Sequence, residues 1–344
     1  MQLGVKLTPI IVKEVADLNA FRGRSMAVDA FNVLHQFLAL IRTREGRPLS
    51  DMEGRITSHL VGLVFRTTRL MADYQMRLVF VFDGKPPQLK RAEVERRRAI
   101  KQKAEDEYAK AMKTGDYAKA FSKAVQTGRL DTTAINDAKM LLELLGVPWV
   151  QAPSEGEAQA SHMARRGDVW AANSRDYDSL LFGAPRLIRY LTIQGQEWLP
   201  SKRKARRLEP EIIHLEAFLN HHGITRKQLI DLSILIGTDF NPGIKGVGPK
   251  TALKLVTAHG QLENMPGEVA EKIPENFDEI RRLYLEPDVT DDYDIKSGSL
   301  REEALIAFLC DERDFSRQRV NVAINRIKRY YAQKSLTDWF NGGP

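Results

Sequence analysis

Acidic side chains gather where apolar runs of this sequence end, and such an arrangement can support metal chemistry. The stretch PSEGEAQASHMARRGDVWAANSRDYDSLLFG, residues 153–183, places Glu155, Glu157, Asp176 and Asp178 within 24 residues. Carboxylates held close together raise one another's pKa unless cations keep them charged. These four side chains are therefore either spread over a solvated surface or grouped around metal ions.

Three further acids occupy comparable places. Asp29 ends the apolar run RSMAVD, Asp83 ends RLVFVFD, and Asp239 follows an apolar helical stretch at residues 229–236. No histidine or cysteine recurs among these acids, and an all-oxygen ligand set favours Mg²⁺ or Mn²⁺ over zinc. A pair of such ions can clamp the attacking and leaving oxygens of a phosphodiester. We therefore expect two Mg²⁺ per subunit, replaceable by Mn²⁺, near Asp29, Asp83, Glu155, Glu157, Asp176, Asp178 and Asp239.

Each acid also has a purely structural alternative. The tetrapeptide SEGE matches a capping box, in which Ser154 caps the next helix and Glu157 bonds back to its amide. Asp29 could cap another helix, and Asp83 could belong to a turn. For any single acid the structural alternative is at least as good. For the seven acids together, a shared site at one edge of a sheet explains their positions better than seven separate structural roles.

The elements that must position these acids are short strands alternating with helices. Strand-like runs at residues 24–29, 77–83, 147–152 and 168–173 are separated by helical patterns. This order predicts an α/β fold with a central, mainly parallel sheet flanked by helices. Such sheets carry their sites at the carboxyl ends of the strands, which is where the acids lie.

The charge of the chain suggests a polyanionic partner. The formal net charge is +7, residues 85–103 hold eight Lys or Arg against two Glu, and residues 201–207 (SKRKARR) hold five basic residues. Residues 88–126 are charged and helix-forming but lack a sustained apolar face, so a ligand could order them; a solvated insertion without function is the alternative. The single cysteine excludes a disulfide scaffold, and no signal peptide or membrane span is visible.

The stretch GIKGVGPKTALKLVTAHG, residues 243–260, predicts a second phosphate-binding feature. Gly246 and Gly248 allow backbone amides to approach a phosphate at a helix N-terminus, where Pro249 suits the first turn and Lys250 adds charge. This is the pattern of a helix-hairpin-helix that binds DNA without sequence preference. A tight turn between core helices is the structural alternative.

The chain resembles the flap endonuclease family of structure-specific 5′ nucleases. The matching stretches are VDAFNVLHQFLALIR, TSHLVGLVFRTTRL, VFVFDGKPPQLKR, APSEGEAQAS, SRDYDSLLFG and IGTDFNPGIKGVGPKTALKL, in the family's order. The resemblance implies a nuclease core over residues 1–330, with a helical arch at about 85–135 and the helix-hairpin-helix region at about 237–262. It also implies cutting of 5′ flaps, with 5′–3′ exonuclease activity, during lagging-strand maturation and DNA repair.

The resemblance also implies roles for single residues. Asp83, Glu155 and Glu157 would serve a first metal cluster with Asp29 nearby, and Asp176, Asp178 and Asp239 a second. Lys90 and Arg97 match the family's catalytic basic pair on the arch. Residues expected to contact DNA are His35, Arg42, Arg66, Arg69, Gly246, Gly248, Lys250, Arg313, Phe315 and Arg319.

The sequence departs from the family pattern at two places. His35 stands where the family has a tyrosine that stacks on a base beside the cut. The residues Met-Gln-Leu precede Gly4, whereas the family begins Met-Gly.

The last segment, residues 331–344, contains the pattern of a sliding-clamp-binding peptide. Its anchors would be Gln333, Leu336, Trp339 and Phe340. No long basic tail follows, so we expect an archaeal-type, cytoplasmic monomer that binds DNA, the clamp and no membrane. Two alternatives stay open: a related 5′ nuclease acting on bubbles or junctions, and a DNA-junction-binding protein without activity.

Overall fold

A seven-stranded sheet forms the centre of the protein. The computed structural model describes residues 4–43, 47–90, 130, 132–192, 195–199 and 204–340, together with isolated positions between 95 and 110. For residues 195–199, 204–207 and 334–340 only the backbone is described. The strand order is β1-β9-β6-β5-β2-β3-β4, and a separate hairpin pairs β7 (Gly195–Leu199) with β8 (Lys204–Leu208).

The four predicted strands make up one side of this sheet, and they are parallel. They are β2 (Ser25–Asp29), β3 (Arg77–Phe82), β4 (Trp149–Gln151) and β5 (Ala171–Asn173). The prediction of a mainly parallel α/β sheet is therefore confirmed. The sequence reading did not include β6 (Arg186–Arg189), which is parallel to β5, or β9 (Glu211–His214) and β1 (Glu14–Val15), which add antiparallel edges.

Side chains alternate across the central strands and bury both faces of the sheet. Met26 and Val28 of β2 join a core with helices α1 (Ala30–Leu40), α2 (Ser58–Tyr74), α5 (Thr132–Leu145) and α14 (Arg317–Phe340). Ala27 faces the other way, toward α6 (Gly156–Arg166). This two-sided burial explains why these strands are almost wholly apolar.

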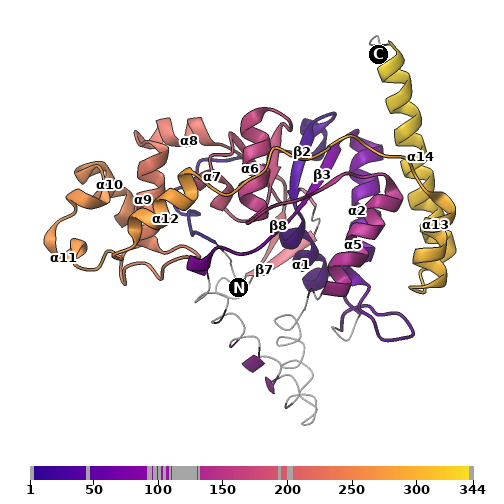
Figure 1. Ribbon diagram of the computed structural model, residues 1–344, viewed down its shortest axis with the longest axis horizontal. Helices are drawn as coiled ribbons and strands as arrows, with labels where there is room; N and C mark the ends of the chain where they lie inside the picture. The colour runs from indigo at the N-terminus through magenta and orange to yellow at the C-terminus, as the bar shows by residue number, and fades with distance from the viewer. Residues whose placement is uncertain are drawn as a thin grey trace.

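A second group of helices packs around the N-terminal segment. It contains α7 (Asp178–Leu181), α8 (Leu215–His222), α9 (Arg226–Ile236), α10 (Pro249–His259), α11 (Gly267–Ala270) and α12 (Phe277–Leu285). Figure 1 shows α8 to α12 at one end of the molecule and α2, α5, α13 (Glu302–Ile306) and α14 at the other. Pro249 is the first residue of α10, as predicted, and α9 packs against α10 across the glycine-rich loop.

Residues 286–301 contain no helix or strand, and we call this segment the strap. It passes α6 on its way from α12 to α13 (Figure 1). Its side chains Tyr293 and Ile295 pack against the α6 face of the sheet. At its far end, the Gly298 amide donates to the Gly146 carbonyl at 2.9 Å.

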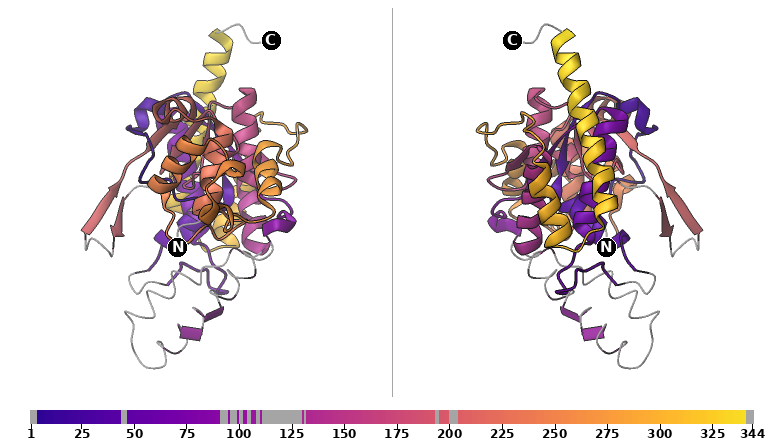
Figure 2. Two further views of the ribbon diagram at one scale, coloured as in Figure 1. Left: turned by 90° about the vertical axis from the view of Figure 1, so that its left-hand side faces the viewer. Right: turned by 90° about the vertical axis from the view of Figure 1, so that its right-hand side faces the viewer.

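Two predicted segments are described only in part. Most of the predicted helical arch, residues 91–129, lies outside the described residues, although the isolated positions described there are helical. The predicted clamp-binding tail begins inside α14, which projects beyond the rest of the chain in both views of Figure 2. Among the described residues, no helix combines the length and the apolar character needed to cross a membrane.

Candidate active site

The carboxyl ends of four neighbouring strands bring most of the predicted acids to one edge of the sheet. Asp29 is the last residue of β2, Asp83 follows β3, Glu155 and Glu157 begin the helix after β4, and Asp176 and Asp178 follow β5. Asp239 reaches this edge from the loop after α9. Each of the seven acids interacts electrostatically with at least one other.

Burial and mutual repulsion make Asp29, Glu157 and Asp178 weaker acids than usual. Burial first, and then Asp83 and Asp176, raise the pKa of Asp29 to about 8. Burial and then Asp178 raise the pKa of Glu157 well above its usual value, and burial and then Asp239 do the same for Asp178. Divalent cations relieve this kind of repulsion, and the all-oxygen donor set fits Mg²⁺ or Mn²⁺.

Two neutral side chains that the sequence reading missed cross-link the acids. The Ser174 hydroxyl lies 3.1 Å from Asp29 Oδ2 and 2.6 Å from Glu157 Oε1. Asn32 donates its side-chain amide to Asp176 Oδ2 at 2.9 Å and its backbone amide to Asp29 Oδ1 at 3.0 Å. Ser174 precedes the RDYD motif by one residue and Asn32 lies three residues after Asp29, and neither spacing is distinctive.

The structural alternative for SEGE, a capping box at the start of α6, is not what the structure shows. The residue that caps α6 is Glu155, and its side chain makes no capping hydrogen bond. Instead, the Gly156 amide donates to Asp83 Oδ1 at 2.6 Å, and a Cβ at residue 156 would lie 2.7 Å from that oxygen. The glycine therefore leaves room for a carboxylate from the neighbouring strand. Asp29, by contrast, does cap α1, so its capping and its place in the acid group coexist.

Lys90 lies among the acids. Its ammonium forms ion pairs with Glu155 and with Asp239, the latter at 3.0 Å. Burial opposes the charge of Lys90, but the two carboxylates outweigh it and raise its pKa. Arg97, the other member of the predicted basic pair, lies outside the described residues.

The acids lie near one another, but their side chains are not yet arranged to coordinate an ion. In the described part of the chain, no three Asp, Glu, His or Cys side chains are arranged to hold an ion. Glu155 and Asp239 are turned to Lys90, while Asp29 and Glu157 are turned to Ser174. Ion binding therefore requires these side chains to exchange their present partners for the cation.

The first described residues belong to the site. Gly4 has a φ of +74°, and a Cβ there would lie 2.1 Å from Asp178 Oδ2. The Val5 amide donates to Asp178 Oδ1 at 3.2 Å. Gly4 therefore packs directly against an acid of the site, whereas residues 1–3 lie outside the described residues.

Several of the predicted DNA contacts meet in a basic hollow of about 370 Å³ between α1, α2 and α14. Arg66 and Arg69 line it from α2, and Arg319 lines it from α14, with its guanidinium 5.0 Å from the centre of the Phe65 ring. Burial and the charge of Arg69 lower the pKa of Arg66 to about 10. Arg326, two helical turns after Arg319, also lines the hollow, and the sequence reading missed it.

The other predicted contacts are more scattered. His35 is exposed on α1, and Arg42 donates to the Ala39 carbonyl at 3.1 Å. Arg313 is buried and pairs through two hydrogen bonds with Asp137, while Phe315 packs against the core.

The glycine-rich loop and the tail complete the set of predicted residues. Gly246 has a φ of +87° and is exposed, as is Lys250, while Gly248 caps α10 without a side chain. In the tail, Gln333 accepts a hydrogen bond from Gln75 at 2.6 Å. The side chains of Leu336, Trp339 and Phe340 lie outside the described residues.

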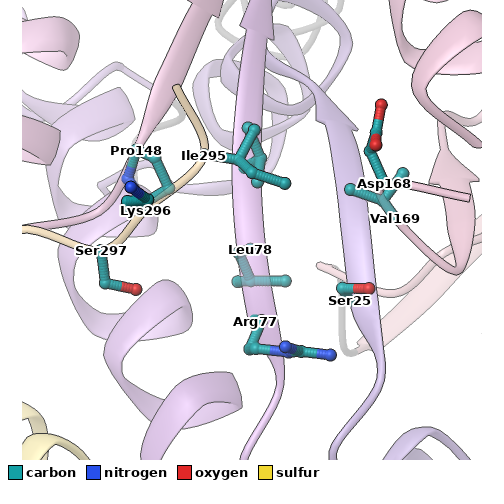
Figure 3. Close-up of a pocket in the computed structure, with 10 residues that line it drawn as sticks. Ser25, Arg77, Leu78, Pro148, Asp168, Val169, Ile295, Lys296 and Ser297 are labelled. Atoms are coloured by element: carbon teal, nitrogen blue, oxygen red, sulfur yellow. The ribbon is translucent and has the colours of Figure 1, made fainter. Parts of the chain in front are cut away.

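Two further hollows differ in their relation to the acids. One of about 530 Å³ is lined by Lys85, Glu155 and Arg282 and opens beside the site. Another, of about 300 Å³, lies between the strap and the sheet (Figure 3). It is lined by Ser25, the first residue of the strand that ends at Asp29, so it lies at the opposite edge of the sheet.

The chain is similar in sequence to two protein families and to known nucleases. The XPG N-terminal domain family matches residues 3–104, and the XPG I-region family matches residues 146–239. Flap endonuclease 1 of Ignicoccus hospitalis is 46% identical over 332 residues, which cover 96% of this chain and 95% of that protein. Flap endonuclease 1 of Methanopyrus kandleri is 48% identical over 330 residues, covering 94% and 93%.

Solved structures show the same likeness. Flap endonuclease-1 from Methanococcus jannaschii superposes with a TM-score of 0.76 at 39% identity, covering 96% of this chain and all of that one. The catalytic core of Rad2 in complex with DNA substrate has a TM-score of 0.69 at 21% identity, which shows a shared fold. The sequence likeness extends over almost the whole chain, and the chain belongs to the flap endonuclease family of nucleases.

Proposed function

We propose that this nuclease acts as a monomer that cuts DNA at the base of 5′ flaps, using two Mg²⁺ ions held by the seven acids. The observation that carries the proposal is the meeting of these acids at one edge of the sheet, where burial and repulsion raise the pKa values of Asp29, Glu157 and Asp178. A protein keeps such an arrangement at a cost in stability, which a catalytic use of cations explains. Replication and repair are the processes that produce such flaps.

The chain's own residues would divide the work as follows. Asp83, Glu155 and Glu157, with Asp29 nearby, would hold one ion, and Asp176, Asp178 and Asp239 the other, with sharing between them. Bound ions supply charge that stabilises a phosphodiester oxyanion and lowers the pKa of water. Lys90 pairs with Glu155 and Asp239, so with these acids holding a cation its ammonium would be available to the scissile phosphate. Arg97 would add a second cation on the arch.

Basic surfaces outside the acids would hold the DNA. Arg66, Arg69 and Arg319 surround one hollow, and the loop with Gly246 and Gly248 presents backbone amides beside Lys250 at the start of α10. Phosphate contacts of this kind fix position on a duplex without reading sequence. Further contacts near the junction would come from His35, Arg42, Arg313 and Phe315. The Arg313 guanidinium is already hydrogen-bonded to Asp137.

The test is a cleavage assay on a 5′-labelled flap with Mg²⁺ or chelator, beside bubble, four-way-junction and duplex substrates. We expect Mg²⁺-dependent cutting at the flap base, faster than on the other substrates. Asp178→Ala should abolish cutting and retain flap binding, because it removes a buried acid and leaves the basic surfaces intact. Unchanged cutting by Asp178→Ala would contradict the metal assignment, and faster cutting of bubbles or junctions would contradict the substrate.

We also propose that the tail binds a sliding clamp through Gln333, Leu336, Trp339 and Phe340. The support is its place at the end of α14, which projects from the molecule. Phe340→Ala should weaken clamp binding while cutting without the clamp stays the same. Equal affinity of the variant and the parent protein for the clamp would refute this role.

A further inference from the structure

A buried arginine that no part of the proposed mechanism uses lies directly behind the acids Asp176 and Asp178. Arg189 ends β6, the strand next to β5, and only 3% of its surface is exposed. It pairs with Glu211 of β9, which is also 3% exposed; Glu211 Oε2 lies 2.9 Å from Arg189 Nη1, and Glu211 Oε1 pairs with Lys13. Buried ion pairs are costly to form, so a buried pair at this place suggests a positional role.

The guanidinium of Arg189 donates hydrogen bonds to the two residues that flank Asp176 in the chain, Arg175 and Tyr177. Its Nε donates to the backbone carbonyl of Arg175 at 2.7 Å, and its Nη1 donates to the Tyr177 hydroxyl at 2.6 Å. Its Nη2 donates to the Tyr190 hydroxyl at 3.0 Å. The donors of a planar guanidinium have a fixed geometry, so these contacts together define the path of residues 175–177.

Tyr177 passes this constraint on to Asp178. Its ring is fully buried and lies under the Arg189 guanidinium, with 4.1 Å between the ring centre and the guanidinium carbon. Its hydroxyl also lies 3.2 Å from the Thr8 hydroxyl, in the N-terminal segment whose Val5 amide binds Asp178. The residue between the two acids is therefore fixed from two directions, which holds the backbone that carries Asp176 and Asp178 in place.

We propose that Arg189, paired with Glu211, is a positioning residue that sets the direction of the Asp176 and Asp178 carboxylates for cation binding. The inference rests on the proposed function, since it assigns these two acids to a metal ion. Arg189 touches no reacting atom in this account. Residues that orient metal ligands from behind typically change metal affinity or activity by about 10- to 100-fold when they are replaced.

The deciding variant is Arg189→Lys, which keeps the charge opposite Glu211 but loses the fork that holds Arg175 and Tyr177. Arg186→Lys is the matched control on the same strand. Arg186 also donates to a backbone carbonyl, that of Trp170, at 3.1 Å, and also lies over an aromatic ring, but at the other end of β6. Tyr177→Phe is a milder second variant that removes one hydrogen bond and keeps the ring.

The primary readout is Mn²⁺ binding to the DNA-free protein, followed by electron paramagnetic resonance, beside thermal unfolding and flap-DNA binding in chelator. We expect Arg189→Lys to weaken Mn²⁺ binding by about tenfold and to raise the Mg²⁺ requirement for cutting similarly. Tyr177→Phe should change both quantities in the same direction by a smaller factor. Arg186→Lys should stay within about twofold of the parent protein, and DNA binding should stay unchanged in all three variants.

A folded Arg189→Lys protein whose Mn²⁺ affinity and Mg²⁺ requirement match those of Arg186→Lys would overturn the proposal, even if its melting temperature is lower. Should Arg189→Lys fail to fold, parental Mn²⁺ binding by Tyr177→Phe would overturn it and weakened binding would support it. A parent protein that binds no Mn²⁺ would contradict the proposed metal site itself. Normal parental binding with unaltered variants would contradict only the positioning role.

Discussion

At the scale of single residues, the buried acids that are proposed to bind metal also destabilise the metal-free protein. The carboxyl of Asp29 is as buried as a core side chain, and its pKa is raised from 3.8 to about 8. Between these two values the folded protein holds a proton that the unfolded chain releases. The stability of the metal-free protein therefore falls as the pH rises from about 4 to about 8, and it is restored as the pH falls.

Asp29→Asn tests this relation, because asparagine caps a helix as well as aspartate does but cannot ionise. In chelator, we expect the variant to be more stable than the parent protein at pH 8, by roughly 1–4 kcal/mol, and similar to it at pH 4. Chemical unfolding at the two pH values measures the difference. A stability gain that is the same at both pH values would contradict repulsion and burial as its cause.

Lys90 is the second residue whose place among the acids can be tested. Its ammonium neutralises Glu155 and Asp239 in the structure, so it competes with a cation for the same oxygens. Lys90→Met should therefore bind Mn²⁺ more tightly than the parent protein in the absence of DNA, by a few-fold, while it cuts a flap much more slowly. Calorimetric titration with Mn²⁺ and single-turnover cleavage separate these effects. Weaker Mn²⁺ binding by the variant would show that Lys90 organises the acids and does not compete for them.

At the scale of elements, the strap holds the helix that carries Glu157. Gln159 of α6 is fully buried, and its side-chain amide forms two hydrogen bonds with the backbone of Thr290, at 2.8 and 2.9 Å. Gln159→Leu would leave the Thr290 amide and carbonyl without these partners. We expect a loss of about 1–3 kcal/mol in the free energy of unfolding and faster proteolysis within residues 286–301.

His162→Ala is the control for this element, because it removes a contact of α6 with the exposed Asp291 of the same strap. Exposed ion pairs contribute about 0–1 kcal/mol, so this variant should change stability little. Equal effects of the two variants would mean that the strap is held by its apolar side chains and not by Gln159.

The elements also show what could be predicted from sequence. The strands that end at Asp29 and Asp83 are apolar on both faces, so their positions and the meeting of their acids follow from pattern alone. The contact of Asp83 with the Gly156 amide does not, since it joins residues 73 apart and displaces the local capping partner Ser154. Ser174, Asn32 and Arg189 escaped notice for the same reason, because their partners come from other strands and helices.

At the scale of the whole molecule, a group of arginines surrounds a hollow that none of the seven acids lines. The formal net charge is +7, although seven carboxylates occupy one edge of the sheet, and Arg66, Arg69, Arg319 and Arg326 surround a hollow of their own. Such a surface would bind a phosphate backbone with release of counterions. The affinity for DNA should therefore fall steeply with salt.

Arg326→Gln tests this surface. It should weaken flap binding and reduce the slope of log affinity against log salt by about 1, with no change in sequence preference. Arg329→Gln is the matched control, because it removes the same charge from the same helix, but at a side chain that faces Asp73 at 3.2 Å. Fluorescence anisotropy at several salt concentrations gives both slopes. Equal slopes for the two variants would mean that the hollow does not contact DNA.

The central claim is that the acids at four strand ends hold two ions together, and anomalous diffraction from crystals of the parent protein soaked in Mn²⁺ tests it most directly. We expect two peaks about 4 Å apart at this edge of the sheet. One should be bordered by Asp83 and Glu155, with Lys90 displaced from Glu155, and the other by Asp176 and Asp178. No peak at this edge, or a single peak that none of these carboxylates touches, would contradict the account.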